Sequence, residues 1–248
     1  MLFRNLLSKM ADLIYPRVCP VCDKASDRPG RHVCWSCFSA VEWYQDGLCD
    51  LCGSFFGGEI KHRYLCSACS GGVRFFDRAR AAAKYDSDIK KVIHAFKYNG
   101  AVWLEKDLTD VLEGCLRAHF EVAKIDVVIP VPLFPAKERY RRYNQSALLA
   151  ESLASRIDRR CDQKSLIRTR ASESQTGFDA KSRRENVKNA FFVTESEMVY
   201  RRHILLVDDV MTTGATLDAC AQALKNAGAA KVWAVSCARN SVGGEGGA

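Results

Sequence analysis

Short apolar runs alternate with amphipathic stretches along most of the chain after residue 73. Continuous apolar runs favour buried strands, whereas apolar positions that recur every three or four residues favour helices. The sequence therefore predicts strands over 78–85, 126–131, 166–169, 204–207 and 231–238, and helices over 86–96, 101–123, 143–157 and 217–227. Strands that alternate with helices in this way predict an α/β domain with a mainly parallel sheet and helices on both faces.

The stretch 204–216 combines a buried strand, two carboxylates and a hydroxyl-rich turn. Ligands of open α/β sheets bind at the carboxyl ends of the strands, so the two acids are expected to face a ligand crevice. The turn precedes a helix, where backbone N–H groups, hydroxyls and a close-approaching glycine favour a phosphate. A sugar phosphate is the predicted ligand, and the candidate binding residues are Asp208, Asp209, Val210, Met211, Thr212, Thr213, Gly214, Ala215 and Thr216.

Other protein classes with paired acids fit this stretch less well. A response-regulator receiver places its acids after the first strand of a domain of about 120 residues, whereas this sequence ends at residue 248. The chain has no Gly-x-x-x-x-Gly-Lys-Ser/Thr loop and no Gly-x-Gly-x-x-Gly motif. The segment instead resembles the phosphoribosyl-pyrophosphate (PRPP) loop of type I phosphoribosyltransferases. That resemblance implies that the acids bond the ribose hydroxyls and that the turn holds the 5-phosphate.

Eight of the twelve cysteines form four Cys-x-x-Cys pairs. Two residues between thiolates let both sulfurs reach one ion, so the pattern predicts two structural zinc sites. Sequential pairing of neighbouring knuckles is favoured over interleaved pairing because it closes shorter loops. Metal would supply the folding free energy of this segment, separately from the sheet. The predicted ligands are Cys19, Cys22, Cys34, Cys37, Cys49, Cys52, Cys66 and Cys69, whereas Cys115, Cys161, Cys220 and Cys237 are expected to be buried.

A disulfide framework is the alternative for these cysteines, and it requires an oxidising compartment. Residues 1–16 have neither the continuous apolar core nor the cleavage site of a signal peptide, and their apolar positions follow one helical face. No apolar run approaches the roughly 18 residues of a membrane span. We therefore expect a cytoplasmic protein with reduced cysteines.

Lys and Arg number 37 against 29 Asp and Glu, which gives a formal net charge of +8. This excess favours anionic partners, phosphates and nucleic acid alike. We expect residues 1–72 to form an N-terminal helix and a double zinc ribbon, 73–240 the α/β domain, and the glycine-rich 241–248 a disordered tail.

The order of motifs along the chain resembles the ComF family. Besides the cysteine pairs and the 204–216 stretch, the resemblance rests on His94-Ala-Phe-Lys-Tyr-Asn-Gly100, the proline-containing run 129–133, Tyr143-Asn-Gln145, and Gln175 with Arg183 and Asn186. It implies a type I phosphoribosyltransferase fold. For members in transformable bacteria it implies a role in natural DNA uptake, alongside other DNA-uptake proteins.

One position departs from the family pattern. The family usually shows Arg-Gly-Phe-Asn-Gln, where this chain has Arg141-Arg142-Tyr143-Asn144-Gln145. If the glycine serves a positive φ, the loop is expected to be rearranged around Arg142, because a Cβ disfavours that conformation.

The pyrophosphate of PRPP needs Mg²⁺ and a cationic contact as it leaves C1. Lys97 is the candidate cation, although a solvated lysine at a helix end is the simpler alternative. Asp209 is assigned binding and a supporting catalytic part. Arg183 and Arg184 are expected in a flexible loop over the site, and His94 is expected to be a helix residue rather than an acid or base.

The segment 137–143 interleaves cations with aromatic rings, a composition typical of proteins that bind single-stranded DNA. A solvated loop, with Tyr143 packed into the core, is the alternative. Two function classes thus remain open: an enzyme that displaces pyrophosphate from PRPP, and a DNA-uptake factor in which the PRPP site is a ligand pocket. The candidate DNA-binding residues are Lys137, Arg139, Tyr140, Arg141 and Arg142.

Overall fold

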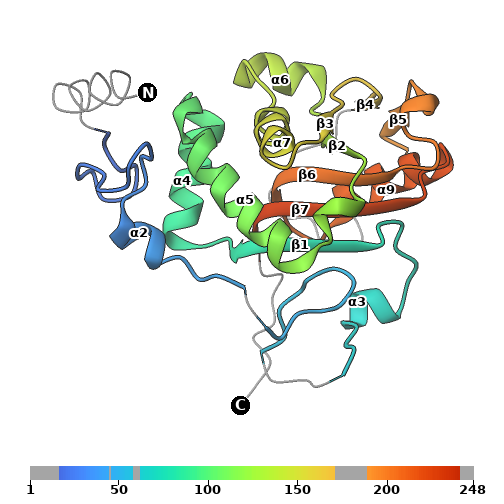
Figure 1. Cartoon of the computed structure of the whole chain (residues 1–248), viewed down its shortest axis with the longest axis horizontal. Helices are drawn as coiled ribbons and strands as arrows, with labels where there is room; N and C mark the ends of the chain where they lie inside the picture. Colours follow the sequence, from blue (N-terminus) through green and yellow to red (C-terminus); the bar gives the residue numbers. More distant parts are fainter. Residues whose placement is uncertain (1–16, 45, 58–61, 171–188, 241–248) are drawn as a thin grey trace.

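A computed structural model of the chain describes residues 17–44, 46–57, 62–170 and 189–240. Its main sheet has five parallel strands in the order β1-β7-β6-β2-β3 (Figure 1). The predicted α/β fold with a mainly parallel sheet is confirmed. The strands span Arg78–Lys84 (β1), Val127–Pro130 (β2), Arg160–Cys161 (β3), His203–Met211 (β6) and Lys231–Arg239 (β7).

Helices cover both faces of this sheet, as predicted (Figure 1). Leu205 and Val207 of β6 pack in one buried cluster with α4, α5 and α7, whereas Ile204 and Leu206 pack with α9. Successive strand residues point to opposite faces, so one apolar run serves both layers. None of the described helices is long and apolar enough to cross a membrane. These four helices span Ser87–Tyr98 (α4), Glu105–His119 (α5), Gln145–Arg156 (α7) and Ala215–Asn226 (α9).

Several short elements complete the described part of the chain. A separate two-stranded antiparallel sheet pairs Leu166–Arg168 (β4) with Phe191–Val193 (β5). The remaining elements are the helices Trp35–Ser39 (α2), Ser67–Ser70 (α3) and Pro135–Arg141 (α6), and the 3-10 turns Val102–Leu104 (η1), Val122–Lys124 (η2) and Ser196–Met198 (η3).

The observed elements differ from the predicted ones in several places. The expected helix over 101–123 is divided into η1, α5 and η2, because Phe120 is extended and packs against Trp233. β4 leaves the main sheet, and β3, β5 and α6 were not predicted. β6 continues past the acid pair to Met211, since Val210 and Met211 still pair with β7.

Arg142 ends α6 in the left-handed conformation, with φ at +70°. Arginine therefore occupies a left-handed position here. A Cβ at such a position costs roughly 1–2 kcal/mol relative to glycine. The arginine that departs from the family pattern thus carries backbone strain at the end of α6.

The two cysteine segments are joined to the α/β domain rather than separate from it. Cys19 and Cys37 lie in the buried cluster that contains α4 and α5, and Cys49 and Cys52 lie in the cluster that contains α9. Backbone hydrogen bonds also tie both segments to β1, from Tyr44 N to Ala82 O at 2.9 Å and from Ala79 N to Leu51 O at 2.8 Å. In this arrangement we expect loss of metal to affect the packing of the sheet as well.

Candidate functional site

The acid pair lies near the end of β6 and is held by contacts from three elements. Oδ1 of Asp208 accepts hydrogen bonds from Ser146 Oγ, at the start of α7, and from the Asp209 backbone N–H, both at 2.9 Å. Oδ2 of Asp209 lies 2.9 Å from the ammonium group of Lys97, in the last turn of α4. The structure thus brings the two predicted catalytic residues together.

Electrostatic effects differ between these three groups. Burial opposes the charge of Lys97, but the charge and hydrogen bond of Asp209, together with the charge of Asp208, outweigh it, and the pKa of Lys97 is raised. Burial and then the adjacent charge of Asp209 raise the pKa of Asp208 to about 7. One carboxylate is therefore paired with a cation, while its neighbour takes up a proton near neutral pH.

The hydroxyl-rich turn stands at the N-terminus of α9, as predicted. Gly214 is the N-cap residue with φ at +79°, and Oγ1 of Thr213 accepts a hydrogen bond from Ala215 N at 3.3 Å. A Cβ on Gly214 would lie 2.8 Å from Cε of Met211. The left-handed backbone therefore favours glycine here, and the flexible end of the Met211 side chain packs against it. A helix N-terminus of this kind favours an anion.

Further cations surround the lysine–aspartate pair. The pKa of Lys137 is lowered, first because neighbouring protein atoms desolvate its ammonium group and then because Arg141 and Lys97 repel it. The charge of Asp209 acts in the opposite direction. Arg141 is buried and donates to Gln145 Oε1 at 3.0 Å and to the Tyr98 hydroxyl at 2.8 Å. These positions add positive potential on the Lys97 side of the acid pair.

Ser146 is the contact that sequence reasoning missed. Its backbone N–H donates to Oδ1 of the N-cap residue Asn144, so the start of α7 sets the direction of its hydroxyl toward Asp208. The signal lay in the Tyr143-Asn-Gln145 motif, where an asparagine just before an apolar periodic run marks a helix start.

The candidate DNA-binding residues lie on and just after the short helix α6. Lys137, Arg139, Tyr140 and Arg142 are exposed, with Tyr140 at 81%, and we call these four residues the α6 surface. Arg141 instead points inward, as its hydrogen bonds show. Tyr143 is half-buried and donates its hydroxyl hydrogen to the Phe96 carbonyl, so it packs as a core residue.

The eight predicted zinc ligands form two clusters of four, 19/22/34/37 and 49/52/66/69, in the sequential order expected. Within each cluster the sulfur atoms all lie within 4.8 Å of one another. Cys22 Sγ and Cys34 Sγ are 3.7 Å apart, as are Cys52 Sγ and Cys66 Sγ. Tetrahedral zinc with Zn–S bonds of about 2.3 Å requires sulfur separations of about 3.8 Å. The clusters therefore fit two structural zinc sites, and all twelve cysteines are free of disulfides.

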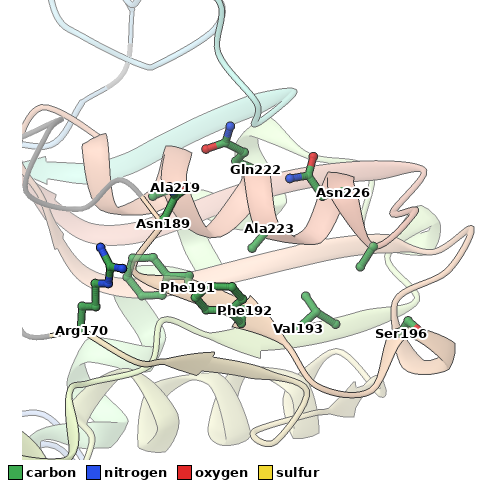
Figure 2. Close-up of a pocket in the computed structure, with 11 residues that line it drawn as sticks. Arg170, Asn189, Phe191, Phe192, Val193, Ser196, Ala219, Gln222, Ala223 and Asn226 are labelled. Carbon is green, nitrogen blue, oxygen red and sulfur yellow. The ribbon is translucent and has the colours of Figure 1, made fainter.

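An open hollow of about 630 Å³ lies elsewhere, between β5 and α9. Figure 2 shows Phe191 and Phe192 on one side of it and Gln222 and Asn226 on the other. None of the predicted site residues lines it. The described residues do not include 1–16, 241–248, the motif residues Gln175 and Asn186, or Arg183 and Arg184, which were expected in a loop over the site.

Two family models match separate parts of the chain. Residues 10–70 match the model of a double zinc ribbon domain, and residues 144–245 match the model of a phosphoribosyl transferase domain.

Three relatives match over most of their own length. The DNA utilization protein YhgH of Escherichia coli O6:H1 is 30% identical over 81% of this chain and 93% of the relative. Competence protein F of Haemophilus influenzae is 28% identical over 83% of this chain and 96% of the relative. Competence protein ComFC of Bacillus subtilis is 27% identical over 88% of this chain and 92% of the relative.

Proposed function

Because the chain belongs to the ComF family, we propose that it is a PRPP-binding, phosphoribosyltransferase-like protein that acts in DNA uptake. One observation carries the proposal: an acid pair and a phosphate-type turn follow one another at the end of β6, with Lys97 2.9 Å from Asp209. The names of the relatives, competence and DNA utilization proteins, support the DNA-uptake part.

Each part of the site suits one part of PRPP. The N–H groups and hydroxyls at the start of α9 suit the 5-phosphate. The carboxylates of Asp208 and Asp209 can accept hydrogen bonds from the two ribose hydroxyls. Ser146 holds Asp208 in place by its hydrogen bond of 2.9 Å, which leaves the second carboxylate oxygen for the ligand.

The pyrophosphate would lie toward Lys97, where Lys137 and the guanidinium group of Arg141 add to the positive electrostatic potential. Mg²⁺ bound with PRPP would supply the remaining charge neutralisation, since it binds substrate phosphates with few protein ligands. Lys97 then stabilises the negative charge that develops on pyrophosphate as the C1–O bond breaks. The ion pair with Asp209 orients the ammonium group before the ligand arrives.

The reaction class that follows is displacement of pyrophosphate at C1 by a nucleophilic acceptor. An assay of pyrophosphate release with a panel of nucleobases and amines decides between an enzyme and a ligand-binding protein. Release that depends on one acceptor and is lost in Lys97→Met supports the enzyme, whereas binding of PRPP without release for any acceptor supports the ligand pocket.

Calorimetry with PRPP and Mg²⁺ tests the binding itself. Replacing Asp208 and Asp209 together by Asn removes two charged acceptors, each about 1.5–3 kcal/mol, so the affinity should fall about a hundredfold or more. The matched control replaces Glu195 and Glu197, both exposed, by Gln and makes the same change in net charge. Equal PRPP affinity in all three proteins would contradict the proposal.

The second candidate function is binding of single-stranded DNA by the α6 surface. It is favoured by the exposed ring of Tyr140 beside three exposed cations, because bases stack on aromatic rings while cations follow the phosphates. Arg141 does not belong to this surface, since its guanidinium is bonded inside the protein.

Fluorescence anisotropy with labelled oligo-dT tests the second function. Arg139→Glu with Arg142→Glu should abolish binding, and Tyr140→Ala should cost about 1–3 kcal/mol. The log–log salt slope of the wild type should be roughly −0.7 per neutralised phosphate. Lys106→Glu with Lys164→Glu reverses the same charge at two other exposed positions and serves as the control. Equal losses of DNA affinity in both double variants would show that the α6 surface is not the DNA-binding site.

Partners and location follow from the same proposal. Other DNA-uptake proteins are the expected macromolecular partners. A cytoplasmic location is proposed because two four-thiolate zinc sites require reduced cysteines, and thiols stay reduced in that compartment.

A further inference from the structure

Two buried arginines hold the second cysteine cluster against the sheet. Arg80 on β1 donates to the carbonyl oxygen of Cys49 at 3.2 Å and to that of Asp50 at 3.0 Å. Arg239 on β7 donates to the carbonyl oxygen of Cys52 at 2.6 Å. Both arginines are less than 9% exposed. A four-thiolate zinc site carries a charge of about −2, so two buried cations beside it also offset its charge.

Arg239 also contacts Met211, the residue just before the candidate phosphate turn. Nη1 of Arg239, which donates to Cys52, lies 3.4 Å from Sδ of Met211. Arg239 and Met211 are paired across β7 and β6, and the next residue, Asn240, donates from its backbone N–H to Met211 O at 2.9 Å. The guanidinium group of Arg239 therefore joins a carbonyl of the second cluster to the end of β6.

The side chain of Met211 packs against the phosphate turn at Gly214. It is 2% exposed, and its Cε lies so close to Gly214 that a Cβ there would be at 2.8 Å. Phe76 lies next to the same position, at 3.8 Å from that Cβ. The end of the Met211 side chain therefore packs directly against the Gly214 backbone, so a change of its rotamer would alter the packing of the turn.

We propose that Arg239 is a positioning residue that couples the second zinc cluster to the phosphate turn at residues 212–216. The proposal rests on the proposed function, because it assigns the turn to the 5-phosphate of PRPP. Zinc at Cys49, Cys52, Cys66 and Cys69 fixes the knuckle carbonyl, the carbonyl orients the guanidinium, and the guanidinium holds Met211 under Gly214. The zinc ribbon then supports ligand binding without contacting the ligand.

Amide hydrogen exchange of the ligand-free protein tests this coupling independently of PRPP. Arg239→Met should speed exchange in the peptide that covers residues 212–216 by about tenfold or more, because the turn loses its support. Arg80→Met is the matched control, since it also removes a buried guanidinium from the same knuckle but has no contact with Met211. Both variants should release zinc to a chelator faster than the wild type.

Calorimetry with PRPP and Mg²⁺ provides the second readout. The affinity should fall about tenfold in Arg239→Met, stay near wild type in Arg80→Met, and recover partly in Arg239→Lys, which keeps a charge and a donor. Met211→Leu, which keeps the buried volume, should speed turn exchange in the same direction even if Arg239→Met does not fold. Equal turn exchange in Arg239→Met, Met211→Leu and Arg80→Met would overturn the coupling. A wild type that fails to bind PRPP would instead overturn the proposed function, and the exchange result would still decide the coupling.

Discussion

Lys97 Nζ and Asp209 Oδ2 form a buried ion pair at 2.9 Å, which joins the end of α4 to the end of β6. The lysine side chain is 14% exposed and the aspartate side chain 4%. Removing one partner of such a pair leaves an uncompensated charge in the protein. The pair thus links the stability of the fold to the residues proposed for pyrophosphate.

Lys97→Met should destabilise the protein by about 3–5 kcal/mol, because Asp209 is left buried without its cation. The double variant Lys97→Met, Asp209→Asn should regain part of this loss. Urea denaturation of the four proteins of the cycle measures the coupling. Additive changes in the free energy of unfolding would mean that the pair is a solvated surface contact.

Asp208 makes the stability of the ligand-free protein depend on pH. Its pKa is raised by burial and by Asp209 to about 7, so the folded state holds this proton more tightly than the unfolded chain. The contribution is therefore fully present at low pH and is lost as the pH rises through about 7. Asp208→Asn should remove that loss and be more stable than the wild type at about pH 8, by at most about 4 kcal/mol. Thermal unfolding of the wild type and Asp208→Asn at about pH 5 and pH 8 measures this effect. If the stability difference between the two proteins is the same at both pH values, Asp208 has an ordinary pKa.

Binding of PRPP should respond to pH in the opposite direction. A protonated Asp208 is a poorer acceptor for the ribose hydroxyls, so the Kd for PRPP with Mg²⁺ should fall about tenfold between about pH 6 and pH 8. Asp208→Asn is the control, because the pH dependence of its Kd should reflect only the titration of PRPP itself. Identical pH profiles for both proteins, measured by calorimetry, would separate Asp208 from ligand binding.

Metal analysis of freshly purified, reduced protein should give two zinc ions per chain and about one in Cys49→Ser. Since Cys49 lies in the buried cluster that contains α9, this variant should also lower the thermal stability of the α/β domain. Cys220→Ser is the control, because Cys220 is buried but lies in neither set of ligands. Fewer than two zinc ions in the wild type would contradict the assignment.

Arg142→Gly should stabilise the protein by up to about 1 kcal/mol. The left-handed φ of +70° strains arginine but not glycine, and the greater freedom of glycine in the unfolded chain offsets part of the gain. Arg142→Ala keeps the strain and should show no gain. A lower melting temperature for the glycine variant than for the alanine variant would refute this interpretation.

The parallel sheet and the two metal clusters were predictable because each depends on a pattern repeated along the chain. The buried strand 204–207 and the Cys-x-x-Cys spacing leave few alternatives once the period or ligand geometry is recognised. β3, with two residues, and β5, with three, are too short to show any period. Their pairing depends on contacts between distant segments.

The site was predictable in its residue types but not in its supporting contacts. Lys97 and the acid pair follow from motifs, whereas the hydrogen bond of Ser146 and the position of Arg239 arise where separate strands and helices meet. Similarly, the interpretation of 137–143 as a loop did not predict which of its side chains point into the protein. The helix α6 turns Arg141 inward and leaves its neighbours Tyr140 and Arg142 in solvent.

A crystal structure of the protein with PRPP and Mg²⁺ would test the central claim most directly. The account predicts the 5-phosphate within about 3 Å of backbone N–H groups at residues 213–216. It also predicts the ribose hydroxyls on Asp208 and Asp209, with the pyrophosphate toward Lys97. PRPP bound elsewhere, such as the hollow between β5 and α9, with the turn at 212–216 free of phosphate, would contradict the account.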